Sequence, residues 1–260
     1  MLANKTIKMM TLAGSLLLSS YAIGETLRFG VDANYPPFEY KNPDGSLGGF
    51  DIDLGEAICD ELDVECVWVE NSFDGMIPAL KVQKFDAILS ALSITEQRKQ
   101  EIAFSSMLYN TPGFLVAEKG SSLTDNPEDL AGNEVGVIQG SVFETYAKEY
   151  WQPEGVRITS YEDSEQAYTD LVFGRLDAVL DDGVVLQQAF LDKPQGAGFE
   201  FVGDRVYDEE IFGPGTGIGL RKENTELRER INTAISAIRE DGTYDELASK
   251  YFDFDVYSFD

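Results

Sequence analysis

Strand-like and helix-like segments alternate along this chain of 260 residues, and the alternation limits the folds available to it. Short apolar runs indicate strands, and longer amphipathic runs between them indicate helices. The predicted strands are "TLRFGVDA" (26–33), "ECVWVE" (65–70) and "FDAILSAL" (85–92), the predicted helices are "FDIDLGEAICDEL" (50–62) and "FDGMIPALKVQ" (73–83), and "NPDGSLGG" (42–49) predicts a hairpin turn. This order predicts an α/β fold of mostly parallel sheets flanked by helices. In such sheets, ligands bind where the carboxyl ends of strands turn into the next helix.

A six-residue pattern occurs twice, as "KFDAIL" (84–89) and "RLDAVL" (175–180). Each copy has a basic residue, an apolar residue, Asp-Ala and two more apolar residues. Each copy also follows a predicted helix and precedes polar residues. We interpret the two copies as equivalent strands of two α/β lobes of similar build, each ending at a shared cleft.

Two extended segments, residues 105–122 and 205–223, are predicted to cross between these lobes. Hinges at both crossovers would make the first lobe discontinuous in sequence. We expect the first lobe to comprise residues 25–110 and 214–260, and the second lobe to comprise residues 111–213.

The first 24 residues have the pattern of a secretory signal peptide. Lys5 and Lys8 form a basic start, an apolar centre follows, and Ala22 and Gly24 are small residues at the positions that a signal peptidase requires. The apolar stretch is too short for a membrane span. We therefore expect residues 1–24 to be removed and the mature chain to be soluble and exported.

The chain is strongly acidic, with a formal net charge of −27. Such a surface excludes nonspecific binding to nucleic acid and disfavours binding to anionic membranes. Two interpretations of the acidity stay open. It could concentrate a cationic ligand near the protein, or it could serve solubility or growth in a saline habitat, which we favour because one site needs few carboxylates.

The cysteine and histidine content limits the chemistry of the chain. Cys59 and Cys66 are close in sequence, and export would place them in an oxidising compartment, so we predict a disulfide between them. The absence of histidine excludes histidine-dependent triads and ordinary zinc sites, while a Ser–Lys dyad stays open. The acidic clusters lack the spacing of a calcium loop. We expect no metal and no cofactor.

Arg98 lies where a cation is unfavourable, in the first turn of a helix that follows a strand, "LSALSITEQRKQ" (89–100). Thr95 is the predicted N-cap, so Arg98 takes the third helical position. One interpretation is a surface arginine paired with Glu101. The other is that Arg98 folds back over Ser93 and binds a carboxylate through both arms of its guanidinium.

A second candidate site follows the predicted strand at Val135–Ile138. Gly140 predicts a tight turn, and Ser141 with Glu144 predicts a capping box at a helix start. The backbone N–H groups of Ser141 and Val142 would then point outward and favour an anion. The alternative is an ordinary capped helix with no ligand.

A third candidate is "DAVLDDGVV" (177–185), where Asp181 and Asp182 end the second copy of the repeated pattern. Either aspartate could simply cap the helix that follows. Two together suggest that one faces the cleft as a negative charge. An arginine and N–H groups for a carboxylate, with an aspartate for an ammonium group, are suited to an amino-acid zwitterion.

The chain resembles the periplasmic solute-binding proteins of amino-acid ABC importers, and in particular the lysine/arginine/ornithine- and histidine-binding group. The resemblance runs over the whole mature chain. It rests on "YPPFEY" (35–40), "GFDIDL" (49–54), the Cys59–Cys66 pair, "LSITEQRKQEIAF" (92–104), "GRLDAVLDD" (174–182) and "DGTYDELASKYFDFDVY" (241–257). It implies the two-lobed type II fold of periplasmic binding proteins, with two hinge strands.

The resemblance also implies roles for single residues. Arg98 would hold the α-carboxylate of the ligand with the N–H groups around Ser141 and Val142. Asp182 would hold the α-ammonium group, together with Ser93 and the Ser90 region. Tyr35 and Phe73 would sandwich the ligand side chain, Asp32 would meet its distal positive charge, and Asp51 would add a more distant negative charge.

Two departures from the group affect the ligand preference. The group often has a second serine where this chain has Ala91, and typically has Thr-Gln where this chain has Val142 and Phe143. The departures keep the contacts to the α-carboxylate and α-ammonium groups and change those to the side chain. Arginine is the first choice of ligand, since its guanidinium stacks on aromatic rings; lysine, ornithine and histidine come next.

The resemblance implies a monomeric receptor in the Gram-negative periplasm. It would close over a cationic L-amino acid by hinge motion, deliver it to an inner-membrane ABC permease, and catalyse no reaction. An enzyme on the same scaffold, such as a dehydratase, is one alternative, with Asp32 and Asp182 as its candidate acid or base. A soluble sensor domain for amino acids or opines is another.

Overall fold

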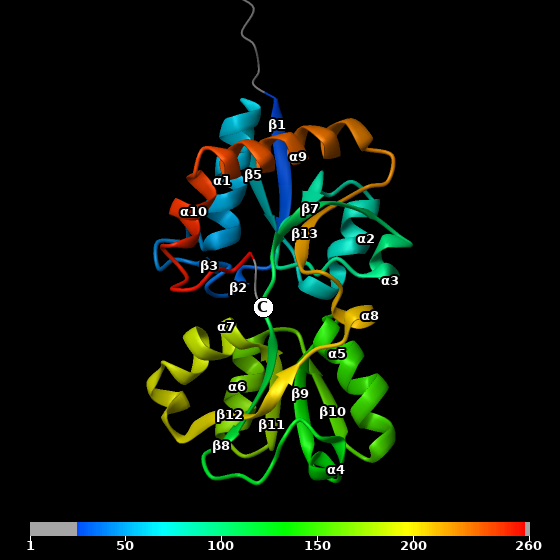
Figure 1. The fold of residues 1–260 in the computed structure, drawn as a ribbon, viewed down its shortest axis with the longest axis vertical. Helices are drawn as coiled ribbons and strands as arrows, with labels where there is room; N and C mark the ends of the chain where they lie inside the picture. Colours follow the sequence, from blue (N-terminus) through cyan, green and yellow to red (C-terminus); the bar gives the residue numbers. More distant parts are fainter. Residues whose placement is uncertain (1–24, 258–260) are drawn as a thin grey trace, which may run out of the picture.

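The computed structural model describes residues 25–257, in two α/β halves that lie one above the other (Figure 1). The predicted signal peptide, residues 1–24, lies outside the described residues. The first sheet has the strand order β5 (Glu65–Glu70), β1 (Thr26–Val31), β6 (Ala87–Ile88), β13 (Thr216–Leu220), β7 (Ala103–Tyr109). The second has the order β10 (Arg157–Tyr161), β9 (Glu134–Ile138), β11 (Ala178–Asp182), β8 (Gly113–Glu118), β12 (Phe199–Val206).

The two sheets have the same topology. In the first, β1 is parallel to β5 and β6, whereas β13 is antiparallel to its neighbours β6 and β7. In the second, β9 is parallel to β10 and β11, whereas β8 is antiparallel to β11 and β12. The reversed strands are those by which the chain enters each sheet from the other half. The predicted α/β fold is confirmed, but each sheet is mixed, because one strand in it is antiparallel to both of its neighbours.

The helices pack around the sheets. They are α1 (Phe50–Leu62), α2 (Met76–Lys81), α3 (Glu96–Lys99), α4 (Pro127–Leu130), α5 (Val142–Tyr146), α6 (Ser164–Val172), α7 (Gly183–Val185), α8 (Glu209–Phe212), α9 (Thr225–Glu240) and α10 (Thr243–Ala248). Single 3-10 turns lie at Phe73–Gly75, Gln152–Glu154 and Pro194–Gly198, and π-helical turns at Ala147–Trp151 and Leu186–Leu191. A small antiparallel sheet of β2 (Asn34–Tyr35), β3 (Glu39–Lys41) and β4 (Leu47–Gly48) contains the predicted hairpin turn.

Two local predictions were wrong. The segment 205–223 is not extended throughout, because Asp208 caps a helical turn, α8, by accepting hydrogen bonds from the N–H groups of Glu210 and Ile211 at 3.0 and 2.9 Å. The predicted strand at 85–92 is shortened to Ala87–Ile88. Beyond it the backbone turns sharply at Ala91, where φ is +44°. The predicted Cys59–Cys66 disulfide is confirmed and joins α1 to β5.

The repeated six-residue pattern marks equivalent strands, β6 and β11. The carboxylate of Asp86, just before β6, accepts a hydrogen bond from the N–H of Arg28 in β1 at 3.2 Å. The carboxylate of Asp177, just before β11, likewise accepts from the N–H of Glu134 in β9 at 2.7 Å. Each aspartate therefore ties a central strand to its parallel neighbour.

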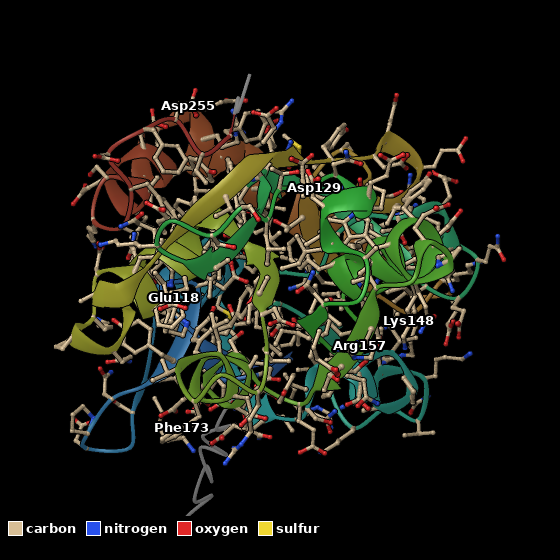
Figure 2. The ribbon with its side chains drawn as sticks, turned by 90° about the horizontal axis from the view of Figure 1, so that it is seen from below. Glu118, Asp129, Lys148, Arg157, Phe173 and Asp255 are labelled. Atoms are coloured by element: carbon tan, nitrogen blue, oxygen red, sulfur yellow. A yellow bond between two sulfur atoms is a disulfide. The ribbon has the colours of Figure 1, made fainter. Side chains whose placement is uncertain are left out.

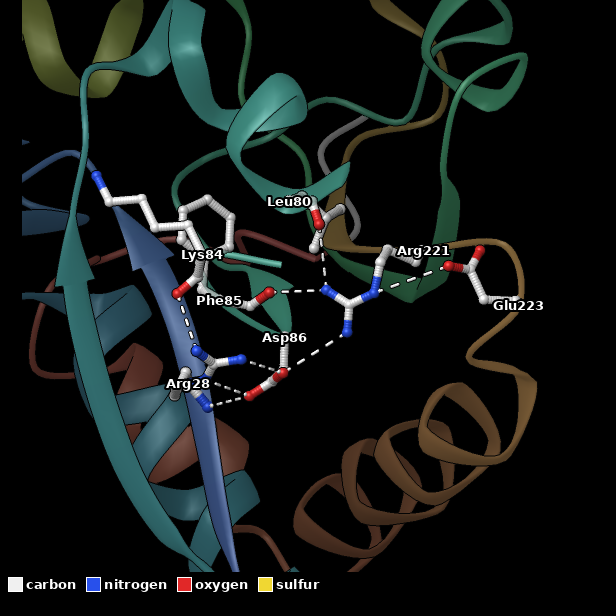
Figure 3. A network of polar contacts seen from close by, with 7 residues as sticks. All are labelled: Arg28, Leu80, Lys84, Phe85, Asp86, Arg221 and Glu223. Atoms are coloured by element: carbon white, nitrogen blue, oxygen red, sulfur yellow. Dashed lines mark hydrogen bonds and ion pairs between the residues drawn. The ribbon is translucent and has the colours of Figure 1, made fainter. Parts of the chain in front are cut away.

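A polar network fastens the C-terminal segment to the first sheet (Figure 3). Asp86 accepts hydrogen bonds from Nε and Nη2 of Arg28 at 2.9 and 2.8 Å, and it forms an ion pair with Arg221, at 3.6 Å, just after β13. Arg221 also donates to the carbonyl oxygens of Leu80 and Phe85 at 3.2 and 2.8 Å. The network therefore joins β1, β6, α2 and the chain that returns from the second half.

Replacing Asp86 with alanine is expected to lower the free energy of unfolding by about 1.5–3 kcal/mol, because it leaves two arginines without their shared acceptor. Burial alone would raise the pKa of Asp86, but the bonds and charges of Arg28 and Arg221 outweigh it and lower that pKa below 3.8. The stabilisation is therefore present at neutral pH and is lost as the pH falls below 3.8. Urea unfolding at pH 7 and pH 3 measures it. The matched Asp177→Ala variant, which removes an exposed carboxylate, should lose less; equal losses would contradict the assignment.

Many of the polar side chains that project around the second half, viewed end-on in Figure 2, carry carboxylates, among them Glu118 and Asp129. Lys148 and the apolar Phe173 are also exposed there. Among residues 25–257, no helix is long and apolar enough to cross a membrane.

Candidate functional site

A cavity lies between the two halves, at the carboxyl ends of β1, β6, β9 and β10. Nine residues predicted from sequence line it: Asp32, Tyr35, Phe73, Ala91, Ser93, Arg98, Ser141, Val142 and Phe143. Three predicted residues do not line it, namely Asp51, Ser90 and Asp182.

Hydrogen bonds across the gap hold the two halves together around the cavity. The hydroxyl of Tyr35 donates to Oδ1 of Asp181 at 2.6 Å, and Nη2 of Arg98 donates to the carbonyl oxygen of Gly140 at 3.0 Å. The amide of Gln139 donates to Asp74 at 3.2 Å. The structure therefore represents a closed arrangement.

Arg98 is a partly buried cation without a carboxylate partner. Nη1 donates to the carbonyl oxygen of Ser93 at 2.8 Å, and the guanidinium lies 5.5 Å from the ring centroid of Phe73. Desolvation lowers the pKa of Arg98 to about 10, so the side chain stays charged at neutral pH. The alternative pairing with Glu101 is wrong, because Glu101 pairs with Lys81 at 2.9 Å. Thr95 is the predicted N-cap and accepts from the N–H of Arg98 at 3.1 Å.

The turn at Gly140 differs from its prediction in one respect. Ser141 caps α5 as expected, since its hydroxyl accepts from the N–H of Glu144 at 3.0 Å. However, the N–H of Ser141 donates to the carbonyl oxygen of Ile138 at 3.1 Å, and the Glu144 carboxylate accepts from the N–H of Gly140 at 2.7 Å. The prediction that the N–H of Ser141 points outward is therefore wrong. Val142 is the first residue of α5, so its N–H has no acceptor within the helix.

Four carboxyl groups line the cavity: Asp32, Glu39, Glu162 and Asp163. Asp32 accepts hydrogen bonds from the N–H of Phe73 at 3.0 Å and from the amide of Asn34 at 2.9 Å. Burial, with some contribution from the charge of Asp163, raises the pKa of Asp32. Among residues 25–257, Arg98 is the only basic residue in the lining. The cavity thus has one cationic group and a large excess of carboxyl groups.

Ser90 and Asp51 lie behind the cavity wall and support it. The hydroxyl of Ser90 accepts from the N–H of Asp32 at 3.0 Å and donates to Glu39 at 2.8 Å. Asp51 accepts from the N–H of Ala91 at 2.8 Å and from the hydroxyl of Tyr109 at 2.8 Å. These two predicted residues therefore orient the residues that line the cavity.

Asp182 caps α7, as the alternative interpretation predicted. Its Oδ1 accepts from the N–H groups of Val184 and Val185 at 2.8 and 3.2 Å, and its Oδ2 accepts from the hydroxyl of Thr111. Burial raises the pKa of Asp182 to about 7. Its neighbour Asp181 is fully buried and accepts a hydrogen bond from the hydroxyl of Tyr35. Neither interpretation predicted this contact.

The positions at which this chain departs from the family pattern all line the cavity. Ala91 lies in the left-handed region, which costs a residue with a Cβ about 1–2 kcal/mol, so its position beside the cavity is maintained by the surrounding contacts. Phe143 lines the cavity and packs edge-to-face on Phe212, with ring centroids 5.5 Å apart. An apolar ring thus replaces an amide in the wall of the second half.

Sequence reasoning missed several residues in the lining, and the acidic ones matter most. Glu39 lies inside "YPPFEY", and Glu162 and Asp163 follow the carboxyl end of β10. The rule that ligands bind at carboxyl ends of strands could have identified the second pair. No local signal marks Glu39, because β3 belongs to the small separate sheet.

Comparison with known proteins gives consistent matches over nearly the whole chain. Residues 27–254 match the bacterial extracellular solute-binding proteins, family 3. The histidine-binding periplasmic protein of Escherichia coli (strain K12) is 50% identical over 236 residues, which cover 91% of each chain. The lysine/arginine/ornithine-binding periplasmic protein of the same strain is 49% identical over 244 residues, 94% of each chain.

A solved structure, that of an ancestral arginine-binding protein bound to arginine, has the same fold. It superposes with a TM-score of 0.81 at 38% sequence identity, over 87% of this chain and 98% of that chain. The fold predicted from the sequence, a two-lobed α/β protein of the type II periplasmic binding class, is thereby confirmed.

Proposed function

Because this chain belongs to the bacterial extracellular solute-binding proteins of family 3, we propose that it binds a cationic L-amino acid between its two halves. Arginine is the first choice, followed by lysine, ornithine and histidine. The relatives named above bind ligands of this class, and the cavity lining has the charged groups that such a ligand requires.

The charge pattern of the cavity is the observation that carries this proposal. One unpaired arginine, Arg98, faces a lining that holds four carboxyl groups. A neutral or acidic ligand would leave the carboxyl groups without a counter-charge. A ligand with one carboxylate and two cationic groups matches both kinds of group at once.

Individual contacts follow from this arrangement. The α-carboxylate of the ligand would accept from Arg98 and from the N–H of Val142, with Ser141 alongside, whereas Ser93 would face the α-ammonium group. The α-ammonium group would approach Asp182, whose buried carboxyl group would gain from a nearby cation. The side chain would run between Tyr35 and Phe73 toward Asp32.

Hinge motion would couple binding to transport. We propose that residues 25–110 and 214–260 move as one lobe against residues 111–213. A ligand that contacts both lobes favours the closed state by its differential affinity for that state. The closed form would then dock, as a monomer, on an ABC permease in the inner membrane after export to the periplasm.

A thermal-shift panel tests the ligand class. Each ligand is added to the mature chain at pH 7, and arginine, lysine, ornithine and histidine are expected to raise the melting temperature. At 100 times its dissociation constant a ligand adds about 2.7 kcal/mol of stability. Glutamate is expected to give no shift. A shift with glutamate and none with the cationic amino acids would refute the proposal.

A further inference from the structure

Glu39 has an environment that its part in the cavity wall does not explain. The residue is 1% exposed and lies on β3, yet it lines the cavity. Its Oε1 accepts from the hydroxyl of Ser90 at 2.8 Å, whereas its Oε2 is buried without any hydrogen-bond donor. Buried carboxylate oxygens are normally bonded, and an unpaired one is costly. The site is therefore incomplete as long as Glu39 is ionised.

The groups around Glu39 are acidic or neutral. Among its titratable neighbours, Asp51 of α1 has the largest influence on Glu39, followed by Asp32 at the end of β1. Tyr109 of β7 donates to Asp51, and Ser90 approaches from the loop after β6. No cation is among the groups that influence Glu39. Because the charge of Asp51 disfavours ionisation of the buried Glu39, the two groups do not both ionise readily.

The titration behaviour agrees with this geometry. Burial, followed by the charge of Asp51, raises the pKa of Glu39 well above its ordinary value. Burial raises the pKa of Asp51 only to about 6, because the N–H of Ala91 and the hydroxyl of Tyr109 donate hydrogen bonds to its ionised form. The proton therefore resides mainly on Glu39.

We propose that Glu39 is a specificity residue, at which the distal cationic group of the bound amino acid replaces this proton. The proposal rests on the function proposed above. The O–H bond of Glu39 breaks, the proton passes to solvent, and an N–H donor of the ligand guanidinium or ammonium group takes its place at Oε2. A ligand without a distal positive charge leaves the proton where it is.

The exchange predicts a pH dependence of known sign. Each cationic ligand releases one proton more than a neutral ligand of the same shape. Its affinity relative to the neutral ligand therefore rises about tenfold per pH unit while Glu39 is protonated in the free protein. The rise stops above the pKa of Glu39.

Calorimetry with arginine and citrulline tests the proposal, since citrulline has a neutral side chain of nearly the same shape. Titrations at pH 7 in two buffers of different ionisation enthalpy give the number of protons released. Binding at the α-ammonium group is common to both ligands, so the difference between them isolates the side chain. We expect arginine to release more protons than citrulline.

The Glu39→Gln variant resembles the protonated state and should reduce this difference to near zero. It should also remove the pH dependence of the arginine-to-citrulline affinity ratio. The matched control, Glu229→Gln at an exposed position of α9, should behave like the unmodified chain. The ratio measured on the unmodified chain between pH 5 and 7 provides a test that does not depend on any variant.

Two results would overturn the proposal while leaving amino-acid binding intact. One is arginine binding with the same proton release as citrulline. The other is an unchanged difference in Glu39→Gln, which would place the proton on Asp32 or Asp51. If no amino acid binds at all, the proposed function fails instead.

Discussion

Replacing Arg98 with alanine is expected to weaken the binding of every α-amino acid, cationic or neutral, by at least about 30-fold. Removing one partner of a desolvated, hydrogen-bonded charge pair costs about 2–5 kcal/mol. Arg98 is the only basic group in the cavity lining, so no other side chain there can replace it. Calorimetric titration with arginine and with citrulline measures the loss.

Two further variants separate the charge of Arg98 from its geometry. Arg98→Lys keeps the positive charge but loses the planar fork, so it should recover only part of the affinity. Lys99→Ala is the matched control, because Lys99 is exposed and pairs with Glu96 at 2.8 Å on the surface. Normal amino-acid binding by Arg98→Ala would show that Arg98 serves only to join the halves through Gly140.

Replacing Asp32 with asparagine is expected to lower the affinity for arginine by about 10- to 100-fold and to leave citrulline nearly unaffected. A hydrogen bond to a charged group is worth about 1.5–3 kcal/mol. Asparagine still offers one oxygen to the N–H of Phe73, so the wall should keep its shape. The ratio of the two dissociation constants at pH 7 is the measurement.

The two ligands provide the internal control for this variant. A parallel loss for arginine and citrulline would mean that Asp32 acts only as the cap of the turn at Phe73. A loss confined to arginine would assign the distal charge to Asp32. This outcome is separate from the Glu39 test, which counts protons and does not depend on the absolute affinity.

Local patterns in the sequence predicted much of the fold because they depend on neighbouring residues. The alternation of strands and helices, the hairpin turn at 42–49 and the caps at Thr95, Ser141 and Asp182 all rest on short-range hydrogen bonds and periodicity. Helix α8 was not predicted, because its capping residue, Asp208, lies in a glycine-rich segment that we expected to be extended. Local capping outweighed that composition.

The candidate site was only partly predictable, because local patterns do not show which distant residues come together. Nine of the twelve ligand-binding candidates line the cavity, since carboxyl ends of parallel strands meet at one edge. The sequence could not show that Asp51 and Ser90 lie behind the wall, because their partners are 40 and 58 residues distant along the chain.

The sequence by itself thus determined the fold class, the family resemblance, the disulfide and the position of an arginine in the first turn of a helix. Only the tertiary structure decided which charges in the site are compensated. It brings Tyr35 across the gap to Asp181, leaves Arg98 without a carboxylate, and buries Glu39 against Asp51. The physical reason is that desolvation and pairing depend on groups from both halves, which come together only when the chain folds and closes.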